Sequence, residues 1–233
     1  LAAQVAGNWS RSKTPLRLYE TLAAISHHDD LEKEWDENLL TAAGAPLDFT
    51  LEQDIDLDKM RRHAENSLYR GRWVALLTSM HLDFLNQGRR EQAEGLGEFL
   101  DQQEQLRAQW RQELNISEED AQAAYNFMRW CDRMSLILCQ RKVPEAGRHL
   151  EVQVGPDGQH YSIFQLENGH LGVTPWPFNE PEITVNVEAC CLSQLKFDSN
   201  DELREALKNA PRKTLTWTFE QTEPVEKESS KKK

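Results

Sequence analysis

The sequence predicts an α+β protein in which the helices come first and the strands follow. Apolar residues recur at helical spacing through residues 1–143, which is the pattern of a helical bundle. From residue 144 to residue 221 the apolar residues alternate and turn sequences interrupt them, which indicates a small antiparallel β-sheet. One face of each strand is apolar, so we expect this sheet to pack on the helices. Residues 222–233 are charged and are expected to form a disordered tail.

The composition is that of a folded protein with an acidic surface. The chain has 233 residues and a net charge of −12, and an acidic excess argues against nucleic acid as the main partner, since that needs clustered Lys and Arg. No apolar run approaches the roughly 18 residues of a membrane helix, and no signal peptide is visible. The four cysteines lack the CxxC spacing of a zinc site. We therefore expect a cytoplasmic protein with no nucleic-acid or membrane partner.

Cap and turn residues divide the helical part into segments. The opening LAAQVAGNW indicates the end of a helix. Thr14-Pro15 predicts the start of the next helix, which runs through LRLYETLAAISHHDD, because Thr caps helices and Pro fits the first helical position. After the loop TAAGAPLDF, helices are predicted from near Asp56 and through GRWVALLTSMHLDFL. The polar residues 91–114 carry a thin apolar stripe, and Ser117 predicts the start of the last helix.

The second part of the chain reads as strands separated by turns. LEVQV, HYSIFQL and HLGVTPWPF are divided by Pro-Asp-Gly and Glu-Asn-Gly. EITVNVEACCLSQLKF alternates as one long strand, DSNDELREALKNA is a short capped helix and KTLTWTF is a final strand. In TPWPF, prolines stiffen a loop that carries Trp176 and Phe178, and we expect these rings to pack against the helices.

Three ionisable residues fall on apolar stripes of separate predicted helices. Side chains three and four residues apart share a helix face, so each helix is expected to direct one metal-competent group toward the core. The stripes are Leu18, Leu22, Ile25 and Asp29; then Val74, Leu77, His81 and Leu85; then Tyr125, Met128, Asp132, Leu136 and Cys139.

A metal ion would explain this placement. A buried carboxylate costs several kcal/mol unless it is paired or bound to a cation. One divalent ion would compensate both Asp29 and Asp132, and His28 adds a donor from the same turn as Asp29. A mixed set of His and Asp donors suits Mn²⁺, Fe²⁺, Mg²⁺ or Zn²⁺.

Each residue also has an ordinary structural explanation. A single His such as His81 on an apolar stripe is usually a hydrogen-bonded core residue. Ion pairs offer another solution for the carboxylates: Asp29 with Arg70 or Arg72, and Asp132 with Arg129 or Arg133.

The pair His28-Asp29, followed by Asp132 on a later helix, resembles the HD superfamily of metal-dependent phosphohydrolases, whose pattern is H…HD…D on a helical bundle. A closer resemblance is to a bacterial family of uncharacterised proteins, the domain of unknown function 3891 family. Its characteristic segments match HHDDLEKEWDE, PLDF, SMHLDFL and CDRMSLILC in order and spacing, and FLDQQEQLRAQWRQEL and TPWPF also look like the family. The resemblance extends nearly to Phe219. Leu31-Glu32 replaces the Gly-Trp that the family carries after the HD pair.

These resemblances imply a function and roles for four residues. They imply an HD-like bundle in which His28, Asp29 and Asp132 bind a divalent metal and His81 is catalytic, binds the phosphate or is a further ligand. The implied activity is metal-dependent hydrolysis of a small phosphorylated metabolite or nucleotide. The alternative is a catalytically silent HD-like binding or regulatory module, which the Leu31-Glu32 departure favours. A weaker third possibility is an interaction scaffold that works through the strands.

Overall fold

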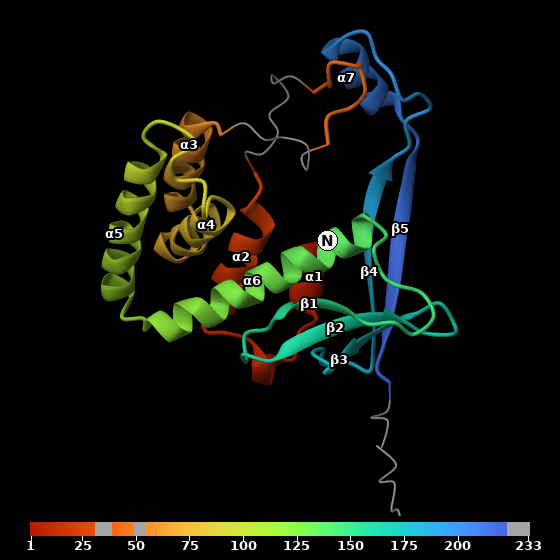
Figure 1. The fold of residues 1–233 in the computed structure, drawn as a ribbon. Helices are drawn as coiled ribbons and strands as arrows, with labels where there is room; N and C mark the ends of the chain where they lie inside the picture. The colour runs from red at the N-terminus through yellow and green to blue at the C-terminus, as the bar shows by residue number, and fades with distance from the viewer. Residues whose placement is uncertain (31–38, 49–54, 223–233) are drawn as a thin grey trace, which may run out of the picture.

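The computed structural model describes residues 1–30, 39–48 and 55–222, which form a mixed α+β fold (Figure 1). The predicted charged tail, apart from its first residue, and the Leu31-Glu32 pair lie outside the described residues. Within them α1 to α6 come first in the chain, and the sheet follows, with α7 between its last two strands. The helices are α1 (Ala2–Gly7), the 3₁₀ turn η1 (Arg11–Lys13), α2 (Leu18–His27), α3 (Leu57–Leu68), α4 (Arg72–Leu85), α5 (Leu96–Leu114), α6 (Glu118–Cys139) and α7 (Asn200–Asn209).

Two of the predicted helix starts are confirmed by their caps. The Asp56 carboxylate accepts a hydrogen bond from the Lys59 N–H at 2.9 Å, and α3 begins at the next residue. The Ser117 hydroxyl accepts one from the Asp120 N–H at 3.0 Å at the start of α6. Both caps satisfy a backbone donor that the first helical turn leaves open.

The predicted start of α2 at Thr14-Pro15 is wrong. The Thr14 hydroxyl donates to the Arg11 carbonyl at 3.0 Å and so closes the 3₁₀ turn instead of opening a helix. Arg17 then takes a left-handed conformation with φ 54°, which interrupts the helical path, and α2 begins at Leu18. The helix is therefore shorter at its start than the sequence suggests.

The five strands form one sheet in the order β1-β2-β3-β5-β4. Their bounds are β1 (Leu150–Val154), β2 (His160–Gln165), β3 (Leu171–Thr174), β4 (Glu182–Cys190) and β5 (Arg212–Glu220). The expectation of an antiparallel sheet holds for every pair except β3 and β5, which run parallel with Leu171 opposite Phe219. The parallel pair arises because β5, the last strand in sequence, inserts between β3 and β4.

The predicted long strand through Phe197 is also too long, since β4 ends at Cys190. Phe197 is buried, but it packs against the loop of residues 39–48, where its N–H donates to the Gly44 carbonyl at 2.8 Å. Gly44 has φ +82°, and a Cβ there would lie 2.7 Å from the Phe197 carbonyl oxygen. The contact therefore needs glycine at this position.

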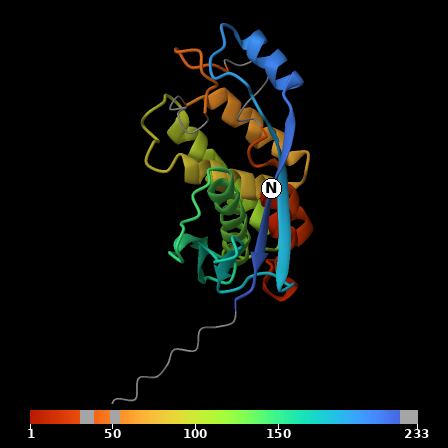
Figure 2. The same ribbon diagram turned by 90° about the vertical axis from the view of Figure 1, so that its right-hand side faces the viewer.

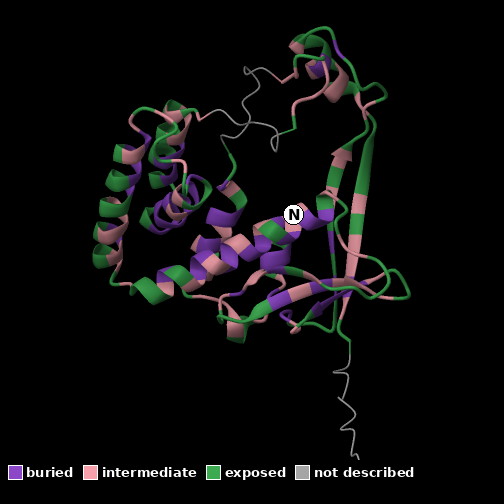
Figure 3. Cartoon of the chain, viewed as in Figure 1, coloured by how far each residue is buried: buried purple, intermediate pink, exposed green. Residues whose placement is uncertain are grey.

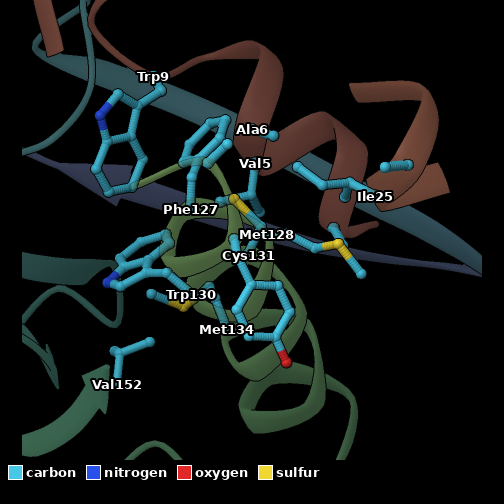
Figure 4. Close-up of a cluster of buried hydrophobic side chains, with 14 of the residues drawn as sticks. Val5, Ala6, Trp9, Ile25, Phe127, Met128, Trp130, Cys131, Met134 and Val152 are labelled. Atoms are coloured by element: carbon cyan, nitrogen blue, oxygen red, sulfur yellow. The ribbon is translucent and has the colours of Figure 1, made fainter. Parts of the chain in front are cut away.

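One hydrophobic core joins the helices to the sheet. It runs from α1, α2, α4 and α6 to buried residues of all five strands. Trp9 lies at its centre, with its ring centroid 5.1 Å from that of Phe127 and 4.6 Å from that of Trp130 (Figure 4). Phe178 of the TPWPF segment is buried beside Trp9 and Phe219, so this ring packs in the core as expected. Figure 3 shows the buried residues following α4 and α6 and continuing into the strands.

β4 and β5 form a long two-stranded ribbon that extends beyond the rest of the sheet. Their register runs over nine residue pairs, from Glu182 opposite Glu220 to Cys190 opposite Arg212. Figure 2 shows the ribbon along the height of the molecule, with α7 at one end of it. Leu203 of α7 is buried there next to the loop of residues 39–48, whose Leu39 N–H donates to the Asn200 side chain at 3.0 Å.

Candidate metal centre

The site is built where α2 ends. This helix stops at His27, with His28 as its C-terminal cap, so Asp29 lies in the turn beyond the helix. The expectation that Asp29 continues the helical stripe of Ile25 is therefore wrong, although the turn still brings His28 into the interior. The His28 side chain is 8 % exposed, whereas that of Asp29 is 45 % exposed. The pair thus places a buried imidazole beside a carboxylate that reaches solvent.

Two further helices supply His81 and Asp132. The donor atoms of His28, His81 and Asp132 all lie within 4.8 Å of one another. The His28 and His81 rings meet edge to face with centroids 5.2 Å apart. The structure thus brings α2, α4 and α6 together around these residues. His81 and Asp132 are the residues that the apolar stripes of α4 and α6 predicted. Asp29 joins the group through His28, because its Oδ2 lies 2.9 Å from the His28 Nε2.

The two nitrogens of His28 have different surroundings. Nδ1 lies 2.8 Å from the Ile25 carbonyl oxygen, which can only accept, so Nδ1 carries a proton. Nε2 faces two carboxylates, with the Asp29 Oδ2 at 2.9 Å and the Asp132 Oδ1 at 3.3 Å. Nε2 is buried and has no hydrogen-bond partner among the described residues, although both oxygens are near enough. The carboxylates therefore flank this nitrogen without lying in the direction of a hydrogen bond.

Electrostatics at His28 call for a positive charge. Burial lowers the pKa of His28, but the carboxylates of Asp132 and Asp29 more than offset this and raise it to about 10. Burial raises the pKa of Asp29, and the neighbouring His28 more than compensates, so the pKa of Asp29 is lowered. A bare Nε2 lone pair between two carboxylate oxygens would be repelled by both. A cation at the centre of the group, either a proton on Nε2 or a metal ion, would remove this repulsion.

His81 sits in a drier position. Burial, and after it the positive charge of His28, lowers the pKa of His81 to about 4. The Tyr125 hydroxyl lies 3.5 Å from the His81 Nδ1, which is a weak contact. His81 is consequently neutral near pH 7 and can offer a lone pair to a cation.

His63 of α3 is a site residue that the sequence interpretation did not include. It is buried, and its Nε2 donates to the His28 carbonyl oxygen at 2.8 Å. Burial lowers the pKa of His63. It thus fixes the end of α2 from outside the metal-competent group. One signal was available, since Met60, Ala64 and Ser67 share a helix face with His63, but the segment RRHAEN surrounds it with polar residues.

The ion pairs offered as alternatives are not formed as expected. Arg70 binds the Asp30 carboxylate at 2.9 Å, and Arg72 binds Glu113 at 2.7 Å, so neither neutralises Asp29. Within the described part of the chain, Asp132 has no ion pair with Arg129 or Arg133. His28 is instead the partner of both carboxylates, as the distances above show.

A cavity of about 420 Å³ adjoins the site on the side of α5. Phe84 and Tyr125, which both contact His81, also line this cavity. On its α5 wall, the half-buried Arg107 donates to the Ser79 hydroxyl at 3.2 Å and lies 3.6 Å from the Asp83 carboxylate. The cavity is therefore polar and closely connected to the buried histidine.

Comparison with known proteins identifies the family. The family model described as "Protein of unknown function (DUF3891)" matches residues 1–194. The chain belongs to the DUF3891 family. This confirms the closer of the two resemblances drawn from the sequence. No curated protein and no solved structure matches the chain, so the relation of DUF3891 to the HD superfamily stays a prediction.

The matched range covers every residue of the site in this DUF3891 protein. It includes α1 to α6 and β1 to β4, and it ends before α7 and β5. No helix among the described residues is long and apolar enough to cross a membrane.

Proposed function

We propose that this protein is a metal-dependent phosphohydrolase that acts on a small phosphorylated metabolite or nucleotide. The observation that carries the proposal is the buried Nε2 of His28, which has no hydrogen-bond partner in the described parts of the chain and lies between two carboxylate oxygens. Its other nitrogen donates to a backbone carbonyl, which is the arrangement that orients metal-binding histidines.

The donor set fits a divalent ion. Asp29 and Asp132 would supply charged oxygens and His28 a nitrogen, while His81, neutral near pH 7, would supply a second nitrogen. This mixed set suits Mn²⁺, Fe²⁺, Mg²⁺ or Zn²⁺. The low pKa of His81 favours a role as ligand or phosphate contact over that of a general acid, because an acid must carry a proton at the working pH.

The chemistry depends on what each group holds in place. A bound divalent ion would act as a Lewis acid that lowers the pKa of a water molecule and neutralises the charge of a phosphate ester. Asp29, 45 % exposed, keeps one side of the centre open to solvent and substrate. His63 keeps the α2 terminus, and with it His28 and Asp29, in position through its bond to the His28 carbonyl.

A catalytically silent binding or regulatory module is the second candidate. The raised pKa of His28 favours it, since a proton on Nε2 would compensate both carboxylates without any metal. In that case the same residues form a buried ion cluster whose role is to hold α2 to α6.

The experiment that separates these candidates is elemental analysis of protein purified without chelator, followed by a screen of nucleotides and sugar phosphates with added divalent metals. We expect about one ion per chain in the wild type, loss of the ion in Asp132→Ala and metal-dependent hydrolysis. Equal metal content in the wild type and Asp132→Ala would exclude the metal centre. Bound metal without hydrolysis of any compound in the panel would favour the catalytically silent module.

A further inference from the structure

Arg129 has a charge that the described residues do not neutralise. It lies on α6, and its guanidinium carbon is 3.7 Å from the centroid of the Phe84 ring. No carboxylate of the described residues forms an ion pair with it, whereas Arg70 and Arg107 are bound to Asp30 and Asp83. A half-buried guanidinium without a counter-ion is unusual in a protein of net charge −12.

The ring contact fixes the guanidinium and leaves its donors available. A guanidinium stacked on an aromatic ring is attracted by the ring's electrons. The Tyr125 ring, 5.8 Å away, borders it on the same helix. Stacking occupies the flat face, so the N–H groups at the edge of the plane stay available. That edge matches two oxygens of a phosphate, which Arg binds as a fork.

Arg129 is adjacent to the candidate metal centre. It precedes Asp132 by three residues, so the two side chains leave α6 on one face. Phe84 follows His81 by three residues on α4, and their ring centroids are 6.4 Å apart. Phe84 therefore connects the metal-competent residues with the cavity that it lines together with Tyr125, and Arg129 stacks on this ring.

We propose that Arg129 binds the phosphoryl group of the substrate next to the metal centre. The identification of this phosphoryl group as part of a substrate rests on the proposed function. The anion-binding role of Arg129 rests instead on its guanidinium, which forms no ion pair with a described carboxylate, and it has its own test. In an acidic protein, a phosphate needs a local positive charge to approach the carboxylates of Asp29 and Asp132. Among the described residues, Arg129 is placed to supply this positive charge.

The test is calorimetric titration of the full chain with inorganic phosphate, with and without saturating Mn²⁺. Arg129→Gln removes the charge and the fork, and Arg129→Lys keeps only the charge. Arg133→Gln is the matched control, since it removes the same charge from an exposed position one turn along α6. We expect phosphate affinity to fall about ten- to a hundredfold in Arg129→Gln, from the loss of charge-assisted hydrogen bonds. The phosphate affinity of Arg129→Lys should lie between those of the wild type and Arg129→Gln. The affinity of Arg133→Gln should match that of the wild type.

The outcomes distinguish this proposal from the metal centre. Manganese affinity, measured in the same samples, should be unchanged in Arg129→Gln, and thermal unfolding shows whether that variant folds. Phosphate binding that is equal in the wild type and Arg129→Gln overturns the role of Arg129, as does a wild type that binds no phosphate in either form. Absence of binding by all four of Mn²⁺, Fe²⁺, Mg²⁺ and Zn²⁺ overturns the proposed function alone, while the metal-free titration still decides whether Arg129 holds phosphate.

Discussion

At the scale of single residues, the site depends on how His28 is held. Its Nδ1 donates to Ile25 and its carbonyl accepts from His63, so the ring and the backbone of this residue are fixed from two directions. Such contacts around a metal ligand set its orientation and affinity. In the proposed metal centre, His63 would therefore act through His28, as a positioning residue.

Replacing His63 by Ala should weaken divalent metal binding about 10- to 100-fold, the usual effect of losing an outer contact to a metal ligand. The change removes the donor to the His28 carbonyl and loosens the end of α2. Calorimetric titration with Mn²⁺ measures the effect. His27→Ala is the control, because His27 lies next to His28 but pairs with Asp30 at a partly exposed position. An equal loss of affinity in both variants would contradict the role of His63.

Both Asp132→Ala and Asp132→Asn should lose metal affinity. Asp132→Asn should nevertheless keep the fold. Asn preserves the volume and a hydrogen-bonding oxygen beside His28, but it removes the charge that the ion needs. Thermal unfolding monitored by circular dichroism should give a midpoint near that of the wild type for Asn. A collapsed structure in Asp132→Asn would show that the carboxylate serves folding and not only the ion.

The sequence was sufficient to place His81 and Asp132 together, for a physical reason, whereas His28 was included only as the neighbour of Asp29 and through the HD resemblance. His81 and Asp132 sit inside long helices, where spacing decides which face a residue occupies. Asp29 was placed on such a face as well, but α2 ends before it, because helix ends depend on backbone conformation more than on periodicity. His63 stands among charged residues, so the only signal of its burial was the helix face that it shares with Met60, Ala64 and Ser67, and its contact with the end of α2 could not be recognised from its own helix.

At the scale of elements, α2 and α4 are joined by a buried polar contact. The Trp73 Nε1 donates to the Thr21 hydroxyl at 2.9 Å, and that hydroxyl donates to the Arg17 carbonyl at 3.0 Å. Thr21 and Trp73 are both buried, so neither polar group has water as a substitute. This contact sets the distance between the helices that carry His28 and His81.

Thr21→Val should lower the free energy of unfolding by about 1–3 kcal/mol, since it leaves the buried indole N–H without an acceptor at nearly constant volume. Urea denaturation followed by tryptophan fluorescence measures the change. Ser26→Ala is the control, because that exposed hydroxyl bonds only within its own helix and its loss should cost less than about 0.5 kcal/mol. A Thr21→Val protein as stable as the wild type would show that the contact is dispensable.

Elements with local signals were predictable, and those with distant partners were not. The starts of α3 and α6 follow from Asp56 and Ser117, whose side chains bond within the same turn. The parallel pairing of Leu171 with Phe219 joins residues far apart in sequence, so no local pattern announces it. Phe197 likewise lies beyond the end of β4 and packs against Gly44, a distant partner that no local pattern indicates.

At the scale of the whole molecule, α1, α2, α4 and α6 share one hydrophobic core with the sheet. Residues of α1 and α6 pack with residues of the strands in a single cluster, and the link between α6 and β1 is short. Shared burial of this kind opposes independent motion of two halves.

Limited proteolysis should therefore nick the exposed link at residues 145–148 without separating the halves. The two fragments should elute together on gel filtration under native conditions and separate only in denaturant, since the common core holds them. Elution of two independent stable fragments would contradict this.

The position of β5 within the sheet has a consequence for how the chain must acquire its structure. A ribosome makes β5 after both of the strands that it joins, so until β5 arrives β3 has one open edge and β4 has no neighbour in the sheet. The nascent protein cannot complete its sheet in the order of synthesis, and its core closes only at the end. A product that ends between Cys190 and Arg212 thus leaves β4 without a neighbour and one edge of β3 unpaired, the kind of surface that chaperones and proteases recognise.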